Sequence, residues 1–93
     1  MKEIERISYY EDILDRGEEL INNIRRNIDK LNLMRAEIDE LSKYYDSTER
    51  MHDIELDEEG KLPKDLKRGV LGEDYLDDFL DSYLAIKELI NIL

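Results

Sequence analysis

The residues with the clearest potential for chemistry are the acidic side chains, because the chain has 25 Asp and Glu residues, one histidine and no cysteine. Four acids alternate in mid-sequence, as in a calcium-binding loop: Asp53, Glu55, Asp57 and Glu59. An EF-hand loop starting at Asp53 needs glycine at its sixth position and a bidentate glutamate at its twelfth. Those positions hold Glu58 and Lys64, so the pattern predicts a solvated acidic turn.

Two further sets of side chains have spacings that occur in metal sites. Glu49 and His52 have the Glu-x-x-His spacing of di-iron bundles, but such a site needs two of these motifs and additional glutamates. The other set could hold magnesium as in all-helical nucleotide pyrophosphohydrolases: Glu37, Glu40, Glu73, Asp74 and Asp77. Because acids are as frequent on exposed faces of any highly charged helix, a carboxylate metal-dependent enzyme is the weaker alternative. We expect no metal site and no cofactor.

Nucleophilic catalysis lacks its usual partners in this sequence. Besides tyrosines, the hydroxyl side chains are four serines and one threonine, and a single histidine does not obviously serve any of them. No glycine-rich phosphate-binding loop is present. The sequence therefore predicts no catalytic residue and a protein that is not an enzyme.

One short segment departs from the acidic background, since residues 61–68 carry a net charge of +3 in a chain of net charge -11. Its cations are Lys61, Lys64, Lys67 and Arg68. We expect an internal clamp onto acidic helix faces, or between copies. The alternative is a docking point for an acidic partner or phosphate. Tyr44 is a further docking candidate, because Tyr45 continues an apolar stripe while Tyr44 lies at its border.

Helices must position these residues. From Ile4 to Tyr45, apolar residues recur about every 3.4 residues, close to the spacing of a coiled-coil seam. The pattern predicts one amphipathic helix over about 2–45, in which Gly17 and the Asn22-Asn23 pair permit a bend. Such a helix is roughly 65 Å long.

Three shorter helices are expected after the long one. The first covers about 47–55, with Asp46 as its N-cap, and the second covers about 63–68, between Pro63 and Gly69. The last covers about 73–92 and begins after Gly72. The predicted fold is all-α: a single domain, 1–93, in which the long N-terminal helix packs against the C-terminal helix and two short helices form the crossover.

The two main helices differ in length, and this difference bears on function. At about 30 Å, the last helix covers only half of the first. The remaining apolar stripe must therefore meet a second copy, meet another protein, or fold back on itself at Gly17–Asn23. We expect a homodimer. The acidic charge repels nucleic acid and anionic lipid. With no signal peptide and no run of about 20 apolar residues, we expect a cytoplasmic protein that does not enter a membrane.

Three segments carry a family resemblance: Tyr44-Tyr45-Asp46-Ser47, Gly60-Lys61-Leu62-Pro63-Lys64-Asp65-Leu66-Lys67-Arg68-Gly69-Val70-Leu71, and Glu73-Asp74. In these residues the chain resembles a family of small bacterial proteins, the domain of unknown function family 4298. The resemblance implies a charged helical first half and a final helix, and it implies no reaction or ligand residue.

These expectations favour a non-catalytic helical protein–protein interaction or adaptor module that self-associates. The alternative is an acidic decoy or inhibitor, which imitates phosphate charge on the surface of a basic nucleic-acid-binding protein.

Overall fold

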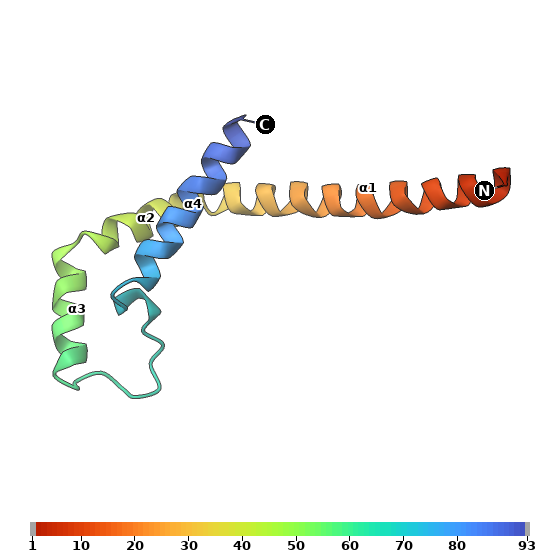
Figure 1. Ribbon diagram of the computed structural model, residues 1–93. Helices are drawn as coiled ribbons and strands as arrows, with labels where there is room; N and C mark the ends of the chain where they lie inside the picture. The colour runs from red at the N-terminus through yellow and green to blue at the C-terminus, as the bar shows by residue number, and fades with distance from the viewer. Residues whose placement is uncertain (1, 93) are drawn as a thin grey trace. The chain divides into compact units, whose positions relative to one another are not determined.

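The computed structural model describes residues 2–92, and it confirms the all-α prediction. Four α-helices and one short 3-10 helix follow one another along the chain (Figure 1): α1, Glu3–Leu33; α2, Arg35–Tyr45; α3, Thr48–Glu58; η1, Gly69–Leu71; and α4, Tyr75–Ile92. No strand occurs among the described residues. None of these helices is long and apolar enough to cross a bilayer.

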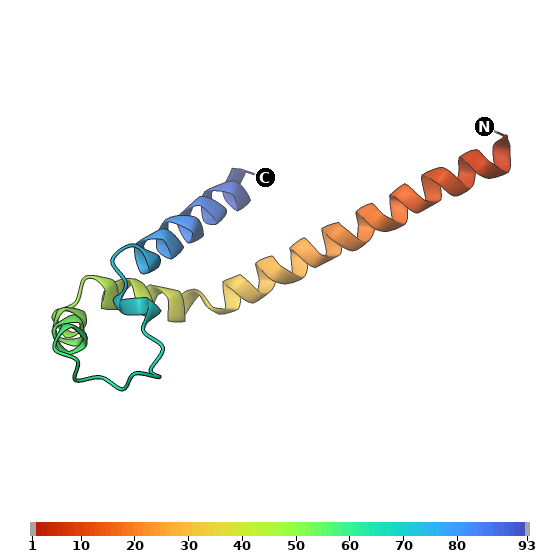
Figure 2. The same cartoon turned by 60° about the horizontal axis from the view of Figure 1, so that its bottom comes forward.

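The chain divides into two compact units, Met1–Ala36 and Glu37–Leu93. The first contains α1 and the first two residues of α2, and the second contains the rest of α2, α3, η1 and α4 together with the long connection between α3 and α4. Figure 2 shows α1 as one long helix.

The long helix ends earlier than the sequence pattern predicts. It continues through Gly17 and the Asn22-Asn23 pair, where a bend was considered, and stops at Leu33. The prediction of one helix to residue 45 is therefore wrong. At the break the Met34 amide donates to the Leu31 carbonyl at 3.1 Å, an i→i−3 bond that tightens the last turn.

Ser47 lies between α2 and α3 and forms hydrogen bonds with both helices. Ser47 Oγ donates to the carbonyl of Tyr44 at 2.7 Å and accepts from the amide of Arg50 at 3.1 Å. Ser47 is therefore the N-cap of α3, one residue later than the predicted Asp46. A hydroxyl both donates and accepts, so Ser47 can satisfy the end of one helix and the start of the next, which a carboxylate cannot do.

The third helix ends in a complete Schellman motif. Gly60 adopts a φ of 70°, a conformation that residues with a Cβ rarely adopt. Its amide donates to the Asp57 carbonyl at 3.0 Å, and the amide of Lys61 donates to the Leu56 carbonyl at 2.9 Å. The chain thus leaves α3, which extends three residues beyond its predicted end, in a sharp turn.

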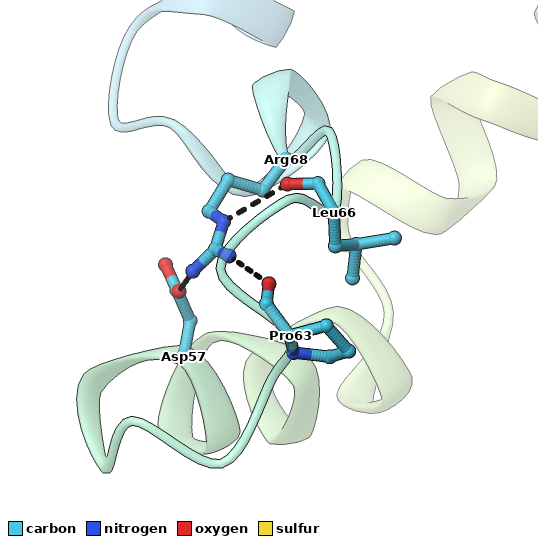
Figure 3. A network of polar contacts seen from close by, with 4 residues as sticks. All are labelled: Asp57, Pro63, Leu66 and Arg68. Carbon is cyan, nitrogen blue, oxygen red and sulfur yellow. Dashed lines mark hydrogen bonds and ion pairs between the residues drawn. The ribbon is translucent and has the colours of Figure 1, made fainter.

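The helix expected over 63–68 does not form. Residues 61–68 are turns and irregular backbone, and the short helix of this region is η1, which begins at Gly69 instead of ending before it. The Arg68 side chain donates to the carbonyls of Pro63 and Leu66 (Figure 3), so side-chain bonds replace helical ones. α4 begins at Tyr75, two residues later than expected.

The second unit has a small core. Ile38 of α2 and Leu76 of α4 are each only 3 % exposed, and they are the buried side chains among the described residues. Of the segment expected to pack against the last helix, α2 supplies residues that line two hollows together with residues of α4.

Candidate functional site

The four cations predicted to form one basic patch do not act together. Arg68 is half-buried, and its guanidinium donates to the carboxylate of Asp57 and to two carbonyls of its own loop (Figure 3). Lys61 pairs locally with Glu59 at 2.7 Å, and both side chains are more than half exposed. Lys64 and Lys67 are exposed and form no ion pair with the residues described.

Arg68 therefore acts as an internal clamp. It connects the last turn of α3, through Asp57, to the crossover segment, defined here as residues 59–74. Each side chain of the Arg68–Asp57 pair is about one-third exposed, at 32 % and 29 %. Water is partly excluded, which strengthens a charge-assisted hydrogen bond relative to one on the open surface.

Tyr44 is also an internal contact. Its hydroxyl donates to Oδ2 of Asp53 at 2.6 Å, so α2 and α3 are joined by a side-chain bond. Burial, followed by the hydrogen bond to Asp53 and the negative charge of that carboxylate, raises the pKa of Tyr44 to about 12. The structure gives this tyrosine a contact within its own unit.

This contact predicts a pH-dependent stability. A raised pKa means that the folded state favours the neutral phenol, so the stabilisation is complete below pH 10 and is lost as the pH rises towards 12. Allowing for partial exposure, we expect Tyr44→Phe to cost about 1 kcal/mol at pH 7 and progressively less above pH 10. Urea denaturation across this range measures the difference. Tyr75→Phe, at a site 74 % exposed, is the matched control, and a Tyr44→Phe difference independent of pH would contradict the assignment.

Sequence reasoning missed Arg50. From the first turn of α3, its Nε donates to the Val70 carbonyl at 2.9 Å and its Nη2 donates to the Gly72 carbonyl at 3.1 Å. The guanidinium carbon also lies 4.9 Å from the centre of the Tyr45 ring, a cation–π distance. One signal was available: Arg50 is the only Lys or Arg in α3, a helix otherwise rich in acids.

Some of the acids considered above as possible metal ligands form contacts within the fold instead. Asp53 and Asp57, four residues apart on α3, bind Tyr44 and Arg68 respectively. With Glu59, which pairs with Lys61, three of the four alternating acids have a partner within the fold. Among the residues that the structure describes, no three His, Cys, Asp or Glu side chains converge in a group that could hold a metal ion. This applies equally to the sets built on Glu49 and on Glu37.

An apolar groove of about 460 Å³ lies in the second unit. Its lining comes from α2, the crossover segment and α4: Leu41, Lys67, Gly69, Val70, Tyr75, Leu76 and Phe79. Several of these apolar side chains remain open to solvent, among them Tyr75 at 74 % and Val70 at 41 %. Lys67 supplies the one charged side chain of the lining.

The residues of the family resemblance thus converge on structural contacts. Tyr44 and Ser47 join α2 to α3, while Gly60 and Arg68 shape the crossover segment. Gly69 lies against the Tyr75 ring, because a Cβ at Gly69 would be 3.7 Å from two ring carbons. These residues therefore help to shape the second unit.

Comparison with known proteins supplies one match. No curated protein and no solved structure shows significant similarity to the chain. The family model described as a domain of unknown function, DUF4298, matches residues 7–91, which is nearly the whole sequence. The chain belongs to the DUF4298 family.

Proposed function

We propose that this chain is a non-catalytic helical interaction or adaptor module that self-associates through α1. The observation that carries the proposal is the exposure of the apolar stripe on this helix. No residue of α1 is buried, and five apolar side chains spaced along its stripe are between 53 and 59 % exposed: Ile7, Tyr10, Leu14, Ile21 and Ile24.

A stripe of this size favours association. Complete burial of a half-exposed Ile or Leu side chain contributes about 1–2 kcal/mol. Several such side chains, aligned on one face over more than two heptads, add up to enough free energy to offset the cost of bringing two chains together. Contiguous apolar surface of this extent is typical of interaction sites.

Local interactions within α1 are too weak to hold such a helix. Within its described residues, α1 has one ion pair, in which Arg16 Nε and Asp12 Oδ2 are 2.9 Å apart and both side chains are about two-thirds exposed. An exposed pair of this kind contributes at most about 0.5 kcal/mol. The like-charged spacings Glu11–Asp15 and Arg26–Lys30 oppose it. We therefore propose that α1 is stabilised mainly by packing against another helix.

The spacing of the stripe favours a second helix as the occupant. Steps of three and four residues alternate from Ile7 to Leu31, which is the spacing of a two-stranded coiled coil. A second copy supplies a stripe of the same length and spacing. The lack of cysteine fits a reducing compartment, and we place the module in the cytoplasm.

Light scattering coupled to size exclusion tests the proposal. We expect about twice the 11.1 kDa mass of the monomer. Ile24→Asp places a charge in the stripe and should return the mass to that of the monomer. Asn22→Asp adds the same charge on another face of the helix and should leave the dimer intact. A monomer for the unaltered chain at high concentration would refute self-association.

A further inference from the structure

We infer that two copies of α1 associate in antiparallel orientation, in one register centred on Glu19. This inference rests on the proposed self-association and adds the direction and alignment of the second copy. It is argued from three features of α1: the positions of its seam residues, the distribution of its charges and the open space at Gly17.

The seam of α1 has a defined heptad register. The first core position of each heptad, position a, is occupied by Ile7, Leu14, Ile21 and Ile28. The second core position, position d, is occupied by Tyr10, Gly17, Ile24 and Leu31. The next core position is Arg35, one residue after the helix breaks at Met34. The run of apolar core positions is therefore interrupted by a charged residue where α1 ends.

The charges of α1 are unevenly distributed along its length. Residues 3–19 contain seven acids and two bases, a net charge of -5, whereas residues 20–33 contain one acid and three bases, a net charge of +2. Two parallel copies would align the acidic halves with each other. An antiparallel pair places each acidic half beside the basic half of the second copy, and charges at coiled-coil distances interact within the Debye length. The charge distribution therefore favours the antiparallel orientation.

Antiparallel packing gives every seam residue a partner. In such a coil a first core position of one helix lies level with a second core position of the other. The register that overlaps all eight positions pairs residues whose numbers sum to 38: Ile7 with Leu31, Tyr10 with Ile28, Leu14 with Ile24, and Gly17 with Ile21. The midpoint of this register is residue 19.

Gly17 supports the same arrangement. Gly17 has no side chain to fill its core position, and no other part of the chain lies within 4 Å of where its Cβ would be. A parallel dimer would place glycine opposite glycine and leave a void. In the antiparallel register Ile21 of the second copy lies opposite Gly17 and fills that space.

Charges beside the seam distinguish this register further. On one flank Glu11 lies beside Arg25 of the second copy, and symmetry forms this attractive pair twice. Glu18 lies beside Glu18 of the second copy, near the two-fold axis of the dimer. This is the one like-charged pair among the residues that flank the seam. On the other flank Leu20, 64 % exposed in the chain, meets its own copy and becomes covered.

Disulfide trapping tests the orientation cleanly because the chain has no cysteine of its own. Leu14→Cys and Ile24→Cys chains are mixed under reducing conditions, exchanged and then oxidised, and the products are separated by mass. We expect the mixed disulfide in roughly tenfold excess over both homodisulfides, because aligned thiols have a high effective concentration. Leu14→Cys mixed with Leu31→Cys is the control, since this register does not align those two positions.

A charge exchange leaves the apolar seam untouched. Glu11→Arg and Arg25→Glu should each weaken the dimer, and the double variant should restore it. Homodisulfides of both Leu14→Cys and Ile24→Cys, with no rescue in the double variant, would show parallel helices and overturn this inference while self-association stands. A monomeric mass for the unaltered chain would remove self-association and the inference with it.

Discussion

Replacement of Leu76 by alanine should destabilise the second unit by about 3 kcal/mol. Leu76 is 3 % exposed and lies in the first turn of α4, beside η1 and the residues of α2 that line the apolar groove. Truncation removes buried methyl groups and leaves a cavity that the surrounding backbone cannot fully close. A folded unit the size of Glu37–Leu93 has a total stability of roughly 3–9 kcal/mol, so the loss is a large fraction of it.

Urea denaturation followed by far-ultraviolet circular dichroism measures this loss. Leu89→Ala is the matched control, since it makes the same truncation in the same helix at a site 53 % exposed, and it should cost less than about 1 kcal/mol. Ile38→Ala should behave like Leu76→Ala. Equal costs for Leu76→Ala and Leu89→Ala would show that the core does not centre on these two buried residues.

The helical content and the approximate positions of the elements could be predicted from the sequence, because both follow from local patterns. The apolar period between Ile4 and Tyr45 identified helix, and the glycines at 60 and 72 marked the ends of the connection. The break at Met34 could not be predicted in the same way, because the apolar stripe continues across it and neither proline nor glycine occurs there. The one sign of the break in the heptad repeat of α1 is Arg35, a charged residue at the core position that follows Leu31.

The structure of the crossover segment depends on contacts that a sequence pattern does not reveal. Pro63 and Gly69 have the spacing that typically starts and ends a short helix, but Arg68 occupies the carbonyls of Pro63 and Leu66. Arg50 binds the carbonyls of Val70 and Gly72 from about 20 residues away. Side-chain bonds to main-chain carbonyls, local for Arg68 and long-range for Arg50, thus shape this segment more than helix propensity does.

The candidate docking residues illustrate the same limit. Composition identified Lys61, Lys64, Lys67 and Arg68 as one basic segment, and an internal clamp was the expected role. Arg68 forms such a contact with Asp57, whereas Lys64 and Lys67 are exposed and form no ion pair with a described residue, and Lys67 lines the apolar groove. Formal charge can be read from the sequence. Whether a cation forms an ion pair depends on which acid the fold places beside it, and for Arg68 that acid is Asp57.

Replacement of Arg68 by methionine should cost the second unit about 2 kcal/mol. The variant keeps an unbranched side chain of similar length, but it removes the ion pair with Asp57 and the bonds to the carbonyls of Pro63 and Leu66. The half-buried Asp57 carboxylate then loses its cation, and the crossover segment loses the contact that holds it to α3. Thermal denaturation at low and high salt measures the change.

Lys64→Met is the matched control for Arg68→Met. Both changes remove one positive charge from the same segment, so they alter the net charge of the chain identically. Lys64 is exposed and forms no ion pair with a described residue, so its replacement should change stability by less than about 0.5 kcal/mol. If the two variants are equally stable, the cost at Arg68 is one of net charge and the clamp contributes nothing. If Arg68→Met alone is destabilised and Asp57→Asn adds little further loss, the two side chains act as one interaction.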